Sequence, residues 1–253
     1  MDSMRIYRFL IPLLLVGVSA SFSSGQDESE TVTLDYVLSR YVESMGGRAN
    51  LQKIMSVRIS GTVDYPDGTS HAITVLKKKP NLVRMILDTG TMRIIQGYDG
   101  KDVWFARESG PNQMVDRLRG ASETSFIRDA PLEGVLMNAY AANAVLELGK
   151  TVVLDGMPCY QIIASFPGGA KSIHCIDREE FNERRIYQYD SDGKLLSELV
   201  PSEFELYDGV LFSMKTDRVK DGEIVSSVTV EDVQINMGIL NAAFSPPSEL
   251  PPR

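Results

Sequence analysis

Aspartate–glycine pairs recur along much of this chain, and they constrain its fold more strongly than any other feature. An Asp-Gly pair readily adopts the positive φ values that a two-residue hairpin turn requires. Five such pairs are taken as turns: Asp67-Gly68, Asp99-Gly100, Asp192-Gly193, Asp208-Gly209 and Asp221-Gly222. Apolar residues between the turns alternate with a period of two, which is typical of strands with one buried face. Strands joined by hairpins pair antiparallel, so the chain is expected to form an antiparallel sheet.

The predicted strands fall into two groups that flank a polar middle section. The first group lies at 57–65, 73–79, 83–87, 92–96 and 103–106. The second group lies at 144–148, 151–154, 159–166, 171–177, 184–190, 195–206, 211–219 and 224–235. Between them, residues 108–120 are polar and marked by glycine and proline, so we expect a loop there. The strand content predicts an α+β protein that is mainly β.

Helical spacing appears in two places. Thr33 is expected to cap a helix that Gly46-Gly47 ends, and a short helix follows at 49–54. A helical insertion is predicted at about 121–141, with one short helix at 121–129 and a second from Leu132 to Ala141 after Pro131. We expect one domain over 33–245 and an extended, proline-rich tail at 246–253.

The first twenty residues have the order of a secretory signal peptide. Arg5 and Arg8 precede the apolar run Phe9–Val18, and Val18-Ser19-Ala20 fits a cleavage site, with a later alternative at Gly25. The apolar run is shorter than the roughly 20 residues that a membrane-spanning helix needs. We therefore expect signal cleavage, a flexible segment at 21–32, and a soluble protein in the periplasm.

The charge balance is acidic, with a formal net charge of −8. Nucleic acids attract basic surfaces, so a nucleic-acid partner is not expected. The basic run Lys77-Lys78-Lys79 is interpreted as a solvated strand end before Pro80, because short charged runs usually face water. The protein is expected to be a monomer.

The only two cysteines flank a predicted hairpin turn. Cys159 and Cys175 lie on either side of Phe166–Ala170, on strands expected to be adjacent, and the two residues should be nearly opposite each other. Export permits disulfide formation, and a bridge closing a loop of this size would contribute about 3 kcal/mol. We predict a disulfide; two buried free thiols are the alternative.

Several short motifs occur in an order that resembles LolA-like proteins, the periplasmic proteins that sort outer-membrane lipoproteins. They lie at 41–47, 79–84, 96–100, 103–104, 207–210 and 244–246. The resemblance implies a curved antiparallel sheet, or half-open β-barrel, with helices covering its concave face. In the sorting carriers that cavity shields lipoprotein acyl chains, and sensors of the same fold detect mislocalised lipoproteins. This chain looks longer than a typical carrier.

Apolar residues of the first strand group and of the inserted helix are the candidates for lining such a cavity. They are Val83, Met85, Leu87, Met92, Ile94 and Trp104 on the strands, and Leu136, Met137 and Tyr140 on the helix. Each buried acyl methylene would gain about 0.8 kcal/mol on leaving water. The competing interpretation is that each of these residues simply packs in the core.

No motif for catalysis or metal binding stands out. His71 and His174 lie on separate predicted strands, whereas a zinc site needs three or four ligands held together. A nucleophile elbow is missing, and the pairs Glu179-Glu180 and Glu203 with Glu205 are interpreted as loop and strand-surface residues. We expect no enzyme, no cofactor and no metal. The predicted function is binding of a lipid or lipoprotein acyl chain; an envelope sensor or protein-interaction module is the alternative.

Overall fold

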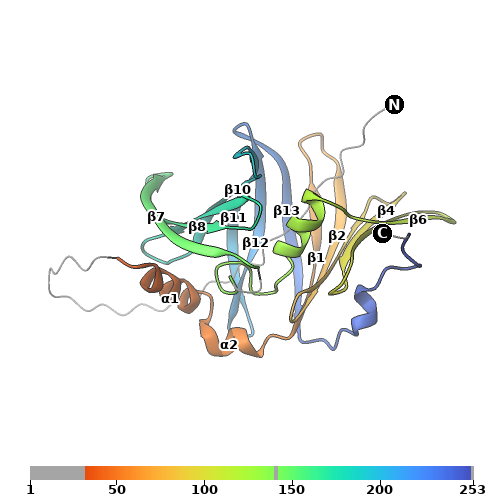
Figure 1. Cartoon of the computed structure of the whole chain (residues 1–253), viewed down its shortest axis with the longest axis horizontal. Helices are drawn as coiled ribbons and strands as arrows, with labels where there is room; N and C mark the ends of the chain where they lie inside the picture. Colours follow the sequence, from red (N-terminus) through yellow and green to blue (C-terminus); the bar gives the residue numbers. More distant parts are fainter. Residues whose placement is uncertain (1–31, 140–141, 252–253) are drawn as a thin grey trace.

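The computed structural model describes residues 32–139 and 142–251 (Figure 1). The predicted signal peptide and nearly all of the predicted flexible segment at 21–32 lie outside these residues. The described chain is built around one antiparallel sheet of thirteen strands. Their order across the sheet is β6-β5-β4-β3-β2-β1-β13-β12-β11-β10-β9-β8-β7, so almost every strand pairs with its neighbours in sequence. The predicted antiparallel, mainly β class is confirmed.

The strands follow the hairpin pattern of the sequence. The bounds in the first half are β1 Ser56–Asp64, β2 Ser70–Lys78, β3 Leu82–Asp88, β4 Arg93–Tyr98, β5 Val103–Ser109 and β6 Asn112–Arg117. Those in the second half are β7 Val145–Leu154, β8 Met157–Ser165, β9 Lys171–Asp177, β10 Glu183–Tyr189, β11 Leu195–Tyr207, β12 Val210–Lys220 and β13 Glu223–Ile235. The two segments predicted at 144–154 form the single strand β7, which carries an irregularity after Leu148.

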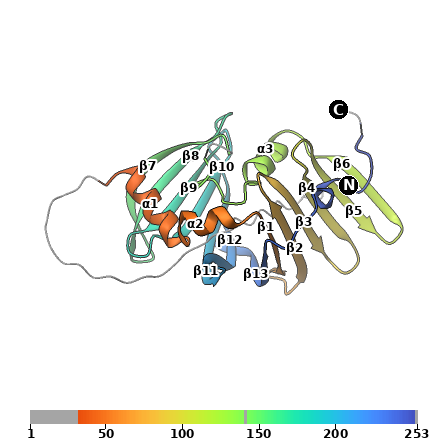
Figure 2. The ribbon, with the colours of Figure 1, turned by 90° about the horizontal axis from the view of Figure 1, so that it is seen from below.

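Pairing between the first and last strands joins the two halves. β1 pairs with β13 from Val57–Ile235 to Asp64–Ser227, while β6 and β7 stand at the two open edges. The sheet is therefore curved but not closed. Figures 1 and 2 show its halves as two wings, with helix α3 in the space between them.

Two helices precede the sheet, as the sequence predicts. α1 spans Leu34–Ser44 and α2 spans Gly47–Lys53. The hydroxyl of Thr33 accepts a hydrogen bond from the Tyr36 backbone N–H at 3.2 Å, which is the expected N-cap. Gly46 adopts a φ of +102°, and a Cβ there would lie 2.1 Å from the Gly209 carbonyl oxygen. Only glycine fits where the chain turns from α1 into α2.

Two expectations for the middle of the chain are wrong. The stretch 108–120, predicted as a loop, contains β6, which forms a hairpin with β5 across Gly110. The inserted helix is confirmed only in part, since α3 spans Ala121–Arg128 but the described residues after Pro131 form turns. Gly134 has a φ of +73° there, which breaks a continuous right-handed helix.

The main core fills the concave face between the two wings. It joins apolar residues of α1 and α2 to inward-facing residues of both wings, among them Val37, Met45, Val57, Val75, Val83, Ile162, Ile176 and Phe212. Phe126 of α3 and the buried Leu132 and Leu136 also belong to it. The protein's own segments thus occupy much of the hollow, and any ligand must use the space that they leave.

The C-terminal segment covers the opposite face of the first wing. The Trp104 indole N–H donates to the Phe244 carbonyl oxygen at 2.9 Å, and Arg84 donates to the Ala243 carbonyl oxygen at 2.9 Å. Leu250 packs against the cluster that contains Trp104. A Cβ on Gly97 would lie 2.4 Å from the Trp104 ring, so glycine makes room for the indole. The tail is accordingly part of the packed structure.

The predicted disulfide is contradicted, because both Cys159 and Cys175 are free thiols. The strands pair as expected, but the register places Cys159 opposite Asp177 and Cys175 opposite Gln161. The two cysteines are diagonal neighbours, and Cβ atoms in diagonal pairs lie farther apart than a disulfide allows. Burial raises the pKa of the Cys175 thiol to about 11.

Candidate functional site

Two pockets share Arg128, at the end of α3, in their linings: the larger lies between α3 and the second wing, and the smaller between residues of both wings. The larger pocket has a volume of about 470 Å³. Its walls are α3, the turn between β8 and β9, the end of β10 and the start of β11. The apolar side chains in its lining include Ile127, Ala142, Phe166, Ala170, Tyr189 and Leu196. We call this space the apolar pocket.

The apolar pocket combines apolar walls with two charged residues, Arg128 and Asp190. The Arg128 guanidinium lies 4.9 Å from the centre of the Phe166 ring and makes a two-point ion pair with Asp129 at 2.9 and 3.0 Å. Phe166 itself packs with Ala142 and Ala164 in a small cluster of its own. A hydrocarbon chain could therefore lie along these walls with a charged residue at one end.

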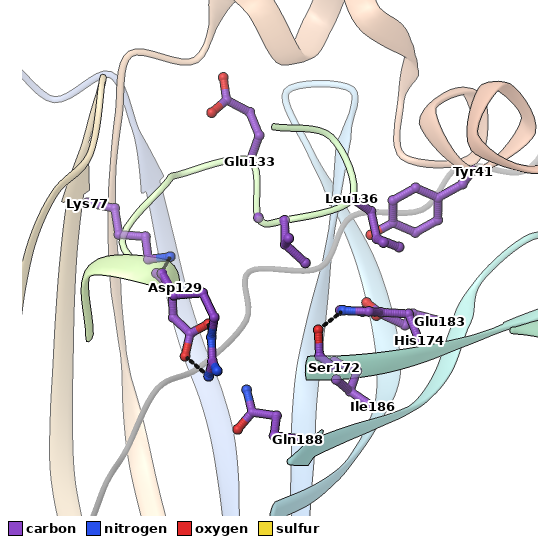
Figure 3. Close-up of a pocket in the computed structure, with 13 residues that line it drawn as sticks. Tyr41, Lys77, Asp129, Glu133, Leu136, Ser172, His174, Glu183, Ile186 and Gln188 are labelled. Carbon is purple, nitrogen blue, oxygen red and sulfur yellow. Dashed lines mark hydrogen bonds and ion pairs between the residues drawn. The ribbon is translucent and has the colours of Figure 1, made fainter. Parts of the chain in front are cut away.

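The smaller pocket measures about 50 Å³ and has both apolar and charged or polar side chains in its lining (Figure 3). Lys77 and Asp129 form one wall, and Ser172, His174 and Glu183 form the facing wall; Arg128, which is ion-paired with Asp129, also lines the pocket. Gln188 lies below them and Leu136 above, as Figure 3 shows. We call this space the polar pocket. It can hold a few water-sized groups and offers them hydrogen-bond donors and acceptors.

Lys77 overturns the interpretation of the basic run as a solvated strand end. Its residue is only 3% exposed, because it shares the inward face of β2 with Ile73 and Val75. The ammonium donates to the Asp129 and Pro131 carbonyl oxygens at 2.9 and 3.2 Å. Burial lowers the pKa of Lys77 from 10.5 to about 8, although the nearby Asp129 and Glu133 act to raise it.

A hydrogen-bonded chain of three side chains forms the opposite wall. His174 Nδ1 contacts the Glu183 carboxylate, and His174 Nε2 lies 2.8 Å from Ser172 Oγ. An ionised carboxylate can only accept, so Nδ1 carries a proton when Glu183 is ionised; Nε2 then accepts from the serine hydroxyl if the ring is neutral and donates to it if the ring is charged. Burial, and then the Glu183 charge, raise the pKa of Tyr41, which reaches this wall from α1.

Strand register explains why these polar groups converge. Ser172 and His174 are two residues apart on β9, so both point to the inner face. On β10, Gln188 is paired with Ser172 and Ile186 with His174. The β9–β10 pairing shifts near Glu183, where the ladder is irregular. The cluster is thus a product of tertiary pairing between two hairpin strands.

The structure separates the residues predicted to line a cavity. Val83, Met85 and Leu87 are buried in the main core, Ile94 packs against it, and Met92 is half-buried. Leu136 borders the polar pocket, and Met137 borders a third hollow of about 230 Å³ beside α2. Trp104 lies on the other face of the sheet, under the C-terminal segment. Tyr140 lies outside the described residues.

None of the predicted residues within the described ranges lines the apolar pocket. That pocket is built from α3 and from turns of the second wing, including Phe166, Tyr189 and Leu196. The sequence contained two signals for the polar pocket, and the first is that Lys77 is in phase with the apolar residues of its strand. The serine–histidine pair at 172 and 174 was a second signal, since both residues must share one face.

Several solved structures are similar to this fold. A DUF1329 family protein from Desulfovibrio piger matches with a TM-score of 0.60 and 15% identity, over 85% of this chain and 98% of that one. A LolA superfamily protein from Nitrosomonas europaea matches with a TM-score of 0.58 and 14% identity, over 85% and 99%. The chain has a LolA-like fold. A putative outer-membrane lipoprotein-sorting protein domain from Vibrio parahaemolyticus is similar too, with a TM-score of 0.58, 10% identity and coverage of 84% and 95%.

The likeness concerns the LolA-like fold alone, because all three identities are low. No family model matches the sequence, and no curated protein matches it. Within 32–139 and 142–251, the structure has no group of three or more His, Cys, Asp or Glu side chains that could hold a metal ion. The helices of these same ranges are all too short or too polar to cross a membrane.

Proposed function

We propose that this LolA-like protein binds a lipid or a lipoprotein acyl chain in the apolar pocket, in the periplasm and without catalysis. The observation that carries the proposal is an apolar-walled space of about 470 Å³ in a fold shared with a lipoprotein-sorting domain. The signal-like N-terminus supports export, and the acidic charge balance disfavours nucleic acid. One domain over 33–245 and a monomeric state remain part of this proposal.

Affinity for a hydrocarbon chain should rise with its length. Each methylene transferred from water contributes about 0.8 kcal/mol, which corresponds to a roughly fourfold gain in affinity. A homologous series of straight-chain alcohols, displacing a fluorescent lipid from delipidated protein, tests this directly. Affinity that does not depend on chain length would refute burial of the chain.

A pair of tryptophan variants on α3 locates the binding site. Thr124 is exposed and lines the apolar pocket, whereas Ser122, two residues away on the same helix, does not line it. Thr124→Trp should fill the pocket and weaken alcohol binding by about tenfold or more. Ser122→Trp is the matched control and should bind like the wild type. Equal binding by both variants would place the ligand elsewhere.

A second candidate function is hydrolysis of an acyl ester, and the hydrogen-bonded chain of Ser172, His174 and Glu183 favours it. A serine hydroxyl, a histidine that can accept its proton and a carboxylate that orients the histidine are the parts of a nucleophilic centre. Gln188, paired with Ser172, could donate to the oxyanion. An acyl chain in the apolar pocket would bring an ester close to this wall.

Covalent labelling decides between the two functions. A fluorophosphonate probe should label Ser172 if the serine is an activated nucleophile, and Ser172→Ala should abolish both labelling and ester hydrolysis. Ser197→Ala, at another buried serine outside the pocket lining, serves as the control. A wild-type protein that binds alcohols but neither reacts with the probe nor cleaves esters is a binding protein.

A further inference from the structure

Lys77 is a buried cation that lacks a carboxylate partner within the described residues. Every ion pair of 4.0 Å or less around it joins other residues: Arg128 with Asp129, and Lys79 with Glu133 at 2.7 Å. The Lys77 ammonium instead donates to two backbone carbonyl oxygens. An ammonium has three donor hydrogens, so one remains for a further acceptor.

A buried charge is costly unless an opposite charge compensates it. Asp129 and Glu133, the two carboxylates whose charges act on Lys77, are each ion-paired with another residue, Arg128 and Lys79 respectively. On the far wall (Figure 3), the Glu183 carboxylate contacts His174 Nδ1. The Lys77 wall of the polar pocket is therefore a place where an incoming anion would gain an ion pair, with Arg128 as a second cation beside it.

Arg128 also lines the apolar pocket, so one side chain borders both spaces. A ligand that used both would have a hydrocarbon part and a small polar end. The polar pocket measures about 50 Å³, which is room for a few water-sized groups. A carboxylate has that size, whereas a sugar or a diphosphate does not.

We propose that the ligand is a long-chain fatty acid, with its chain in the apolar pocket and its carboxylate against Lys77 and Arg128. This inference rests on the proposed lipid-binding function and specifies its ligand class. The carboxylate accepts from the free Lys77 donor and completes the buried ion pair. Hydrogen bonds to charged groups are among the stronger ones in proteins, so losing this one should greatly reduce the affinity for the fatty acid.

The test compares two ligands that differ only in the head group. Palmitate and hexadecanol are titrated at neutral pH into delipidated wild type, Lys77→Met and Lys101→Met. Lys101→Met removes the same charge from an exposed turn and is the matched control. The wild type and Lys101→Met should prefer palmitate by about tenfold or more. Lys77→Met should lose that preference and retain its affinity for hexadecanol.

Three outcomes separate the possibilities. Equal affinity of the wild type for palmitate and hexadecanol overturns the fatty-acid assignment and leaves lipid binding intact. A wild type that binds neither ligand overturns the proposed function itself. Palmitoyl lysophosphatidate is a third probe; a preference for it over palmitate would show that the acidic end is a phosphate and overturn the carboxylate. If Lys77→Met does not fold, Lys77→Gln, which keeps a donor without the charge, takes its place in the comparison.

Discussion

The buried ammonium of Lys77 should impose a characteristic pH dependence on the stability of the ligand-free protein. Its pKa is about 8 in the folded chain, against 10.5 for an ordinary lysine. Below pH 8 the amine is charged in both the folded and unfolded states, and the folded state bears the full desolvation penalty. Between pH 8 and 10.5 the unfolded chain binds more protons than the folded one, so stability rises with pH.

The size of the effect follows from the difference between the two pKa values. One pKa unit corresponds to about 1.36 kcal/mol, so the full contribution is on the order of 3 kcal/mol. Most of it should appear between pH 8 and 10. Lys77 is almost completely buried, so solvent screening reduces this figure little.

Urea denaturation of wild type and Lys77→Met at a series of pH values measures this contribution. Tyrosines and thiols also titrate in this range, but they are common to both proteins and cancel in the difference. The free energy of unfolding of the wild type, relative to the variant, should rise by about 2 kcal/mol or more from pH 7 to pH 10. Lys101→Met should show no such change. A flat difference between wild type and Lys77→Met would refute the burial of a charged amine.

Three further predictions concern other parts of the fold. Cys159 and Cys175 are buried, and burial raises the pKa of each thiol. Both thiols should therefore be unreactive toward an aromatic disulfide reagent at pH 8 in the native protein and should both react in denaturant. If neither thiol reacts in denaturant without a reducing agent, the two cysteines form a disulfide. Gly97→Ala should destabilise the protein by about 1–3 kcal/mol, measured by urea denaturation, because a methyl group would collide with the Trp104 ring. Deletion of residues 239–253 should shift Trp104 fluorescence to longer wavelength and make it accessible to iodide, since that segment covers the indole; an unchanged spectrum would contradict this packing.

The sequence identified the class of fold because turn chemistry and strand periodicity are local. Asp99-Gly100 and Asp208-Gly209 mark their hairpins whatever the rest of the chain does. The cap at Thr33 and the glycine at Gly46 likewise depend on their nearest neighbours. Local rules failed where tertiary pairing supplied the stabilisation, as in edge strand β6, which forms against β5 despite its polar sequence.

The sequence did not determine the register in which β8 and β9 pair, and that register decides which residues lie opposite the two cysteines. Hairpin position alone placed Cys159 and Cys175 on adjacent strands, which is correct. A displacement of two residues along the pair turned expected partners into diagonal neighbours. The register of the next strand pair, β9 with β10, aligned Gln188 with Ser172 and brought both to the polar pocket.

By itself, the sequence determined a hairpin-linked antiparallel sheet with two leading helices, because those elements follow from contacts between residues close in the chain. Only the tertiary structure decided where space remained inside that sheet. Residues of α1 and α3, together with Leu136, pack into the core inside the sheet, and the apolar pocket formed at Phe166, Tyr189 and Leu196 of the second wing. Empty volume depends on how distant segments fill one another's gaps, and no local pattern encodes it.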